Sequence, residues 1–427
     1  MLLIDDHRGG PSERWKYNRL DEAPNSPAWG VTMAPEAKLH RIHAYPAKFP
    51  ALIARNAFDY ADAHGIEVHS VADVFCGSGT VGLEAAARGA SFWGCDINPV
   101  ATMIAKVKNS PMNVAAFVSK AESVLARFER ASSKVPVPDA VQAHLSRWYV
   151  PEQFADLARL RNAVLTEFDG LEASLALECA FSAITKPTSQ WHARSAKPVL
   201  DADKQATPVL AAFTRQCALM ASAWSDGTPV GGSATEIVQG CATRASPSRQ
   251  VDMIVTSPPY ATSYEYSDLH QLSALWLGLV GDHRDLREGA IGTASRRSSL
   301  ARAARDLNEV GLQIVFSLFD RDRPLAEALA TYFLDMQKVA ARCHELVRPG
   351  GLAVFVIGDT RLKGVRIDNA NHLVESLFEA GFGDVRVTRR TIANKPNTSY
   401  RSADGRLASS PTGQAIYSEE YVLMAHR

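Results

Sequence analysis

The stretch VHSVADVFCGSGTVGLEAAARGASFWGCD, residues 68–96, decides the fold. Residues 68–75 form an apolar run typical of a buried strand, and the glycine-rich turn CGSGTVG follows it. The composition of residues 82–89 predicts a helix, and residues 91–96 predict a second strand. A strand, a glycine turn, a helix and a strand within about 30 residues are the opening unit of a doubly wound sheet. We therefore predict an α/β fold with a Rossmann-like sheet.

The glycine turn and the acid that follows it favour a nucleoside cofactor. Gly77 and Gly79 allow backbone N–H groups to approach a ligand closely, and the N-terminus of the helix behind them favours a negative group. Asp96 ends the second strand, where it can accept hydrogen bonds from ribose hydroxyls. Because these residues and Gly82 also fit an NAD-dependent oxidoreductase, they leave that class of enzyme open.

A second stretch, VDMIVTSPPY at residues 251–260, contains polar and aromatic groups that could act on a substrate. Proline cannot donate to a sheet, so the chain leaves the sheet here and projects Ser257, the Pro258 carbonyl and Tyr260 beyond its carboxyl edge. One substrate that such groups would suit is the exocyclic amine of cytosine or adenine. This amine is a weak nucleophile, because its lone pair is delocalised into the ring. Acceptors for its hydrogens, such as Ser257 Oγ and the Pro258 carbonyl, favour the nucleophilic form in the transition state. The Tyr260 ring offers a surface on which a base removed from a duplex can stack.

Both motifs resemble those of S-adenosylmethionine-dependent amino-methyltransferases of DNA. The pattern D-x-F-x-G-x-G from Asp73 resembles the first motif of that family, and TSPPY resembles the catalytic motif of its cytosine-N4 members. Adenine-N6 enzymes more often carry Asp or Asn before the two prolines. The resemblance implies methyl transfer from S-adenosylmethionine to the N4 amine of a flipped cytosine, with adenine N6 as the alternative. RNA guanine-N2 methylation and NAD-dependent oxidation are less favoured, because no separate RNA-binding module is evident and because oxidation leaves TSPPY unexplained.

The resemblance also assigns residues to roles. The segment HAYPAKF, residues 43–49, resembles one that closes over the methionine end of the cofactor; Lys48 is there either a partner for the carboxylate or a plain surface lysine. The strand TEIVQG should end on an acid or amide for the cofactor adenine, but Cys241 stands there, so packing by Ile97, Pro99 and Pro258 is expected instead. The expected catalytic residues are Ser257, Pro258, Pro259 and Tyr260. The expected cofactor-binding residues are Tyr45, Pro46, Lys48, Phe49, Asp73, Phe75, Gly77, Ser78, Gly79, Thr80, Asp96, Ile97, Asn98 and Cys241.

The charge balance limits how the chain can bind nucleic acid. Lys plus Arg is 46 and Asp plus Glu is 46 in 427 residues, which excludes a uniformly basic, histone-like binder and requires any positive surface to be local. Three segments concentrate positive charge or aromatic residues: 186–198, 294–305 and 386–406, the last interpreted as a flexible loop. A solvated surface explains each of them equally well. The residues predicted to contact double-stranded DNA are Lys186, Trp191, Arg194, Arg296, Arg297, Arg389, Arg390, Lys395 and Arg401.

The remaining expectations concern organisation and environment. Six scattered cysteines without a C-x-x-C pair argue against disulfides and zinc, and no metal is expected. The lack of a signal peptide or of a long apolar run predicts a cytoplasmic protein without a membrane contact. The chain is either an orphan enzyme or half of a two-protein system with a separate restriction endonuclease. The predicted organisation is an irregular arm (1–39), a catalytic domain (40–110 and 234–427), a helical insertion and candidate target-recognition domain (111–233), and a smaller insertion that contacts DNA (281–324).

Overall fold

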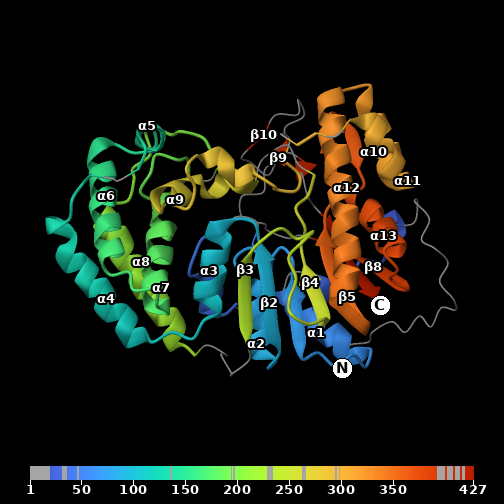
Figure 1. Cartoon of the computed structure of the whole chain (residues 1–427), viewed down its shortest axis with the longest axis horizontal. Coiled ribbons are helices and arrows are strands. Elements are labelled where there is room, and N and C mark those ends of the chain that lie inside the picture. Colours follow the sequence, from blue (N-terminus) through green and yellow to red (C-terminus); the bar gives the residue numbers. More distant parts are fainter. Residues whose placement is uncertain are drawn as a thin grey trace.

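A seven-stranded sheet forms the centre of the computed structural model (Figure 1). Its strand order is β3-β2-β1-β4-β5-β12-β8, and all strands run parallel except β12, which is antiparallel to both neighbours. The strands are β1 (Ser70–Asp73), β2 (Ser91–Asp96), β3 (Thr235–Gln239), β4 (Val251–Thr256), β5 (Val347–Ile357), β8 (Asp384–Thr391) and β12 (Glu419–His426). The predicted doubly wound α/β sheet is confirmed. The structure describes residues 20–30, 36–45, 48–134, 137–193, 195, 198–227, 234–261, 266–293, 296–297, 299–391, 400–401, 407–408, 414–415 and 419–427.

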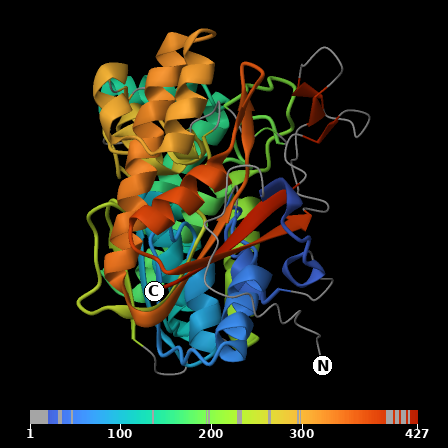
Figure 2. The same ribbon diagram turned by 90° about the vertical axis from the view of Figure 1, so that its right-hand side faces the viewer.

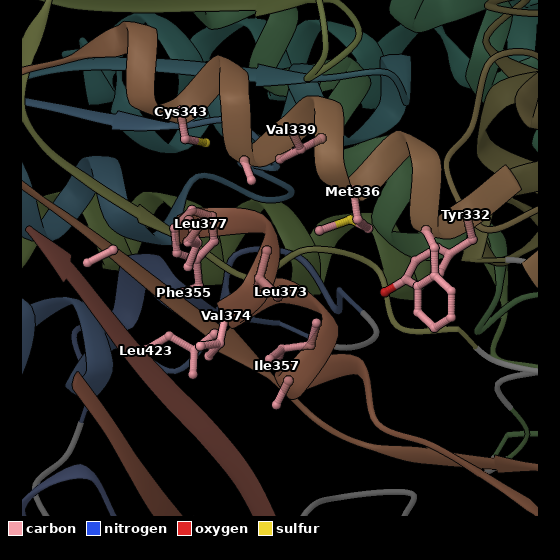
Figure 3. Close-up of a cluster of buried hydrophobic side chains, with 14 of the residues drawn as sticks. Tyr332, Met336, Val339, Cys343, Phe355, Ile357, Leu373, Val374, Leu377 and Leu423 are labelled. Carbon is pink, nitrogen blue, oxygen red and sulfur yellow. The ribbon is translucent and has the colours of Figure 1, made fainter. Parts of the chain in front are cut away.

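Helices cover both faces of the sheet, and the strands are therefore buried on both sides. Met253 and Val255 of β4 belong to a core with α1 (Ala51–Ala63) and α2 (Thr80–Ala87), whereas Ile254 between them belongs to a core with α12 (Arg323–Leu346) and α13 (Asn369–Glu379). Figure 3 shows side chains of α12 facing those of α13 and β5. Alternate residues of one strand thus face opposite layers, as the period of two requires.

The helical segment after the second strand packs against the part of the molecule that contains the sheet. Its core continues through α3 (Pro99–Asn109) and α9 (Gln271–Trp276), where Trp276 is fully buried and lies in ring contact with Tyr149 and Phe154. This segment lies on the left of Figure 1. Its helices are α4 (Val114–Arg127), α5 (Asp139–Ser146), α6 (Pro151–Thr166), α7 (Glu172–Thr185) and α8 (Val209–Ser225), so this part of the chain is helical, as predicted.

The region between β4 and α12 is also helical. It holds η5 (Tyr266–His270), η6 (His283–Arg287), α10 (Leu300–Asp306) and α11 (Glu309–Phe319). Two short strands, β6 (Thr360–Leu362) and β7 (Val365–Ile367), form a hairpin after β5. The remaining elements are η1 (Leu20–Glu22), η2 (Pro27–Trp29), η3 (Lys38–Arg41), η4 (Phe128–Arg130), β9 (Tyr400–Arg401), β10 (Leu407–Ala408) and β11 (Gln414–Ala415).

The prediction that residues 386–406 form a loop is wrong at its start. Residues 386–391 belong to β8, the edge strand of the sheet, where Val385 and Val387 are buried and Arg386 between them is exposed. Several arginines and threonines conceal this alternation in the sequence, and an edge strand accepts them because one side remains open to water. Residues 20–30 lie along this edge, where Arg389 N donates to Pro24 O at 2.8 Å (Figure 2).

Candidate active site

The candidate site lies at the carboxyl edge of the sheet, where the three neighbouring strands β2, β1 and β4 end. Asp96 ends β2, Asp73 ends β1, and Ser257 directly follows β4. Neighbouring parallel strands present their carboxyl ends at one edge, and that edge is where doubly wound folds bind ligands. The structure therefore brings together residues that the sequence placed in two separate motifs.

The glycine loop between β1 and α2 has the backbone conformation that only glycine adopts readily. Gly77 has a φ of 48° and Gly79, which caps the N-terminus of α2, has a φ of 73°. A side chain at Gly79 would also collide with Ala105 and Asn109 of α3, and one at Gly82 would collide with the Phe92 ring. Gly79 and Gly82 therefore allow close packing of helix and strand, while Gly77 lies under the Tyr45 ring at the edge of the site.

Asp96 connects the glycine loop to the next helix. One carboxylate oxygen accepts from Gly77 N at 3.0 Å, and the other accepts from Asn98 N at 2.9 Å. Each oxygen retains a lone pair after these bonds, so the carboxylate can still accept from two hydroxyls. Burial raises the pKa of Asp96, although the backbone bonds oppose that shift. The predicted cofactor residue Asn98 is buried, and its side chain caps α3 by accepting from Val100 N.

Asp73 links the two motifs directly. One of its carboxylate oxygens accepts from Thr256 Oγ1 at 2.6 Å and from Phe75 N at 3.0 Å. The side chain is almost fully buried, and this burial raises the pKa of Asp73 to about 7, although both hydrogen bonds favour the ionised form. The end of β1 and the turn after β4 are therefore held together by one carboxyl group.

The raised pKa of Asp73 predicts that the protein becomes less stable as the pH rises. Between pH 3.8 and about 7 the folded protein keeps a proton on Asp73 that the unfolded chain has released, so this group's contribution to stability falls as pH rises through that window. We expect Asp73→Asn, which cannot ionise, to gain about 1–3 kcal/mol in unfolding free energy relative to wild type between pH 5 and pH 8. Urea denaturation of the cofactor-free protein at both pH values measures this difference.

Asp252 lies near the start of β4, at the amino ends of the strands, and provides the control for that prediction. Burial raises its pKa, but bonds from Arg348, Ser70 and backbone N–H groups outweigh burial, and the pKa is lowered from 3.8. Asp252 is therefore ionised in both states above pH 5, so the stability lost in Asp252→Asn should be equal at pH 5 and pH 8. A pH-independent difference for Asp73→Asn as well would contradict the assigned pKa of Asp73.

The turn TSPPY is fixed from several sides. Ser257 Oγ donates to Val356 O of β5 at 3.0 Å, and Tyr332 of α12 donates to Pro259 O at 3.0 Å. Because the Ser257 hydrogen is used in this bond, the oxygen lone pairs remain available to a ligand. The Tyr260 hydroxyl donates to Glu420 Oε1 at 3.0 Å, and burial holds the pKa of this phenol well above its usual range.

The segment before α1 forms part of the wall of the site. Tyr45 stacks on His270 with ring centroids 4.9 Å apart and lies beside Gly77 of the glycine loop. Lys48 forms an ion pair with Glu36, and its charge is therefore already balanced within the chain. Phe49 packs against the core under α1, and Phe75 packs against the core under α12. Pro46 lies outside the described residues.

The end of β3 carries an amide that the sequence analysis missed. Gln239 Nε2 donates to Ile97 O at 3.4 Å, so the side chain lies beside the residue predicted to pack on the cofactor adenine. Cys241 is half-buried, and its Sγ lies 3.2 Å from Thr243 Oγ1. The prediction considered only the position after the strand; counting back to its last residue would have found Gln239.

A buried lysine below the glycine loop was also missed. Lys108 of α3 is 1% exposed, and its Nζ donates to Ser78 Oγ at 3.1 Å. Burial lowers the pKa of Lys108 to about 7. In the sequence Lys108 is one of two lysines near the end of a helix, and nothing local distinguishes it from Lys106. Thr80, at the start of α2, is buried as well, and its hydroxyl has no hydrogen-bond partner within the described part of the chain.

Two residues predicted to contact DNA are buried, and these predictions are wrong. Trp191 is 1% exposed and stacks on Trp148 with centroids 5.1 Å apart. Arg390 is 3% exposed and lies 3.4 Å from Glu420 Oε2. Both residues fill space inside the protein, where a tryptophan adds apolar area and an arginine needs an acid.

The other basic residues have internal partners or remain at the surface. Lys186 donates to Ser195 O at 2.9 Å, Arg296 pairs with Asp335 at 2.7 Å, and Arg389 donates to Ala23 O at 2.7 Å. Arg297 is exposed. Arg194, Lys395 and the side chain of Arg401 lie outside the described residues.

Comparison with known proteins supports the predicted methyltransferase class. A family model described as "Conserved hypothetical protein 95" matches residues 51–142, which contain the glycine loop and Asp96. The curated Type II methyltransferase M.MvaI of Kocuria varians is 22% identical over an alignment 409 residues long, which covers 87% of this chain and 87% of that protein. The similarity therefore extends through both motifs and the helical segment between them.

Solved structures of methyltransferases are also similar, with low scores. An rRNA methyltransferase, aviRa from Streptomyces viridochromogenes, is 9% identical with a TM-score of 0.29, covering 92% of this chain and 90% of that chain. A TehB-like SAM-dependent methyltransferase from Corynebacterium glutamicum is 9% identical with a TM-score of 0.25, covering 88% and 96%. The α/β fold is therefore identified by its strand order rather than by these superpositions. No helix within the described residues is long and apolar enough to cross a membrane.

Proposed function

We propose that this chain is a site-specific DNA methyltransferase that transfers a methyl group from S-adenosylmethionine to the N4 amine of a flipped cytosine. One observation carries the proposal: Thr256 of the TSPPY motif donates to Asp73 of the glycine-loop motif, so an acceptor for an amine and a nucleoside site share one sheet edge. The relative from Kocuria varians supports the same reaction class. An NAD-dependent oxidoreductase would leave the fixed Ser257–Tyr260 turn without a use.

The residues at the edge fit S-adenosylmethionine. Asp96 retains two lone pairs for the ribose hydroxyls, and Gln239 beside Ile97 offers an amide to the adenine amine. The glycine loop and the Thr80 hydroxyl lie where the methionine end would bind, and Lys108, whose pKa burial lowers to about 7, lies there behind Ser78. A cofactor carboxylate bound beside Lys108 would favour its protonated, positively charged form. Because Lys48 is already paired with Glu36, Lys108 is the better candidate for the cofactor carboxylate. When bound, the cofactor supplies a methyl group on a positively charged sulfur.

The chain's own part in the reaction is to hold the base amine and to change its electronic state. The Ser257 lone pairs and the Pro258 carbonyl accept the amine hydrogens, which favours the pyramidal, nucleophilic form in the transition state. The Tyr260 ring stacks on the extruded base. The main requirement of an in-line transfer is positioning, and no covalent enzyme intermediate is needed. The cysteines accordingly take no part, and all but Cys241 are buried.

DNA contacts are proposed for basic residues that reach the surface. Arg297 is exposed, and Arg296, Lys186 and Arg389 are partly exposed despite their internal partners. We assign target recognition to residues 111–233, which share a core with α3 and α9 beside the site. A surface of this kind, within a chain of zero net charge, should bind DNA with modest and salt-dependent affinity. The chain would act either alone, as an orphan enzyme, or together with a separate restriction endonuclease.

The deciding experiment uses the full chain with methyl-labelled S-adenosylmethionine and plasmid DNA from a host without DNA methylases. The DNA is then hydrolysed to nucleosides, which are separated and counted. Label in N4-methylcytosine supports the proposal, and label in N6-methyladenine selects the alternative. Label that enters only RNA in a parallel reaction overturns both. Ser257→Ala serves as the control for contaminating methylases, because it should remove the label from DNA.

A further inference from the structure

Tyr260 is held by a buried pair of charged residues from strands distant in sequence. Its hydroxyl donates to Glu420 Oε1 of β12 at 3.0 Å, and the other oxygen of Glu420 lies 3.4 Å from Arg390 Nη1 of β8. Glu420 is 6% exposed and Arg390 is 3% exposed, so both charges are out of water. Gly358, directly after β5, leaves room for the Tyr260 ring, because a Cβ at this position would lie only 3.0 Å from Tyr260 Cε2.

We infer that Glu420 and Arg390 are positioning residues that fix the Tyr260 ring for stacking on the target base. This inference rests on the proposed function, in which Tyr260 is the stacking surface. The Tyr260 ring is partly buried and packs against the core on one side. A tyrosine in such a position can still change its side-chain rotamer, which would move the surface on which the base stacks. A hydrogen bond from its hydroxyl to a buried carboxylate restricts the ring to one orientation.

Arg390 supports this arrangement through Glu420. A buried carboxylate without an oppositely charged partner is costly, so Glu420 needs a positive charge beside it to remain at this position. The adjacent Arg390 guanidinium balances the charge of Glu420, and two neighbouring strands of the sheet carry the pair. The phenol has its pKa held well above the usual range by burial and by Glu420, so it remains the donor. The pairing with Glu420 accounts for the burial of Arg390 in β8, whose other arginines are more exposed.

The test removes the tether without leaving a charge alone in the core. Tyr260→Phe keeps the ring and removes the hydroxyl. The pair Glu420→Leu with Arg390→Met removes both charges together, because a single substitution would leave an unpaired buried charge and could prevent folding. We expect each protein to lose about tenfold in kcat for DNA methylation, with the dissociation constant of S-adenosylmethionine changed less than twofold. The triple variant should lose no more than either, because all three residues act through one bond.

A second measurement does not depend on activity. In protein labelled with fluorotyrosine, the ¹⁹F resonance of Tyr260 is identified by its loss in Tyr260→Phe, and it should shift or broaden in the Glu420→Leu, Arg390→Met protein. Arg348→Ala, which breaks an ion pair with Asp252 at the opposite edge of the sheet, should leave both kcat and this resonance unchanged. An unchanged resonance, or kcat losses that multiply in the triple variant, overturns the inference. Wild-type protein that transfers no methyl group to DNA, with the resonance shift present, overturns the proposed function alone.

Discussion

Replacing Ser257 by alanine is expected to lower kcat for methyl transfer to DNA by about 100- to 1000-fold, the usual cost of removing a transition-state acceptor or donor. Ser257 Oγ donates its hydrogen to Val356 O, so its lone pairs are free to accept a hydrogen from the amine. That interaction strengthens as the amine becomes pyramidal, and its loss should therefore appear in kcat more than in KM for DNA. Single-turnover rates with labelled cofactor measure the chemical step directly.

Two controls separate catalysis from structure in this test. Ser257→Thr keeps the hydroxyl and should retain most of the activity, because threonine suits the extended backbone at the end of a strand. Phe316→Ala, at an exposed aromatic residue of α11, should change neither kcat nor cofactor affinity. Ser257→Ala also leaves the Val356 carbonyl without one donor, so its thermal unfolding is measured alongside. An active Ser257→Ala protein with wild-type kcat would contradict the proposed role of the hydroxyl.

The sequence was sufficient to predict the parts of the site that depend on local geometry. The glycine loop, Asp96 and the TSPPY turn each consist of neighbouring residues whose conformation is set by glycine, proline and the end of a strand. The contact between Asp73 and Thr256 could also be expected in outline, since both residues end strands of one parallel sheet. These features follow from rules that act over a few residues.

The residues that the sequence analysis misplaced depend on contacts across long separations. Arg390 stands in a basic segment, and the carboxylate of Glu420 on the neighbouring strand balances its buried charge. Trp191 stands beside Lys186 and Arg194, yet it stacks inside the helical segment on Trp148. Lys108 is buried because α3 crosses the glycine loop at Ser78. Charge and composition along a segment predict none of these partners.

Replacing Asp96 by alanine is expected to weaken S-adenosylmethionine binding by about 100-fold or more, because a hydrogen bond from a ribose hydroxyl to a carboxylate contributes a net of roughly 1.5–3 kcal/mol and two such bonds are lost. The substitution also removes the acceptor of two backbone hydrogen bonds, which Gly77 N and Asn98 N donate to the Asp96 carboxylate. Asp96→Asn keeps one acceptor oxygen and should lose about tenfold. Isothermal titration with the cofactor measures both, and Glu67→Ala, at an exposed acid near the opposite end of β1, should bind normally.

The pH dependence of cofactor binding gives this prediction a second, independent check. Burial raises the pKa of Asp96 above 3.8, so lowering the pH protonates Asp96 in the free protein earlier than an exposed aspartate. A protonated carboxyl group accepts hydroxyl bonds less well, and cofactor affinity should therefore fall as pH drops through that raised pKa. The Asp96→Asn protein has no such proton to take up, so its affinity should depend less on pH than that of wild type. Equal pH dependence in the two proteins, or wild-type affinity in a folded Asp96→Ala protein, would show that the ribose binds elsewhere and would remove Asp96 from the site.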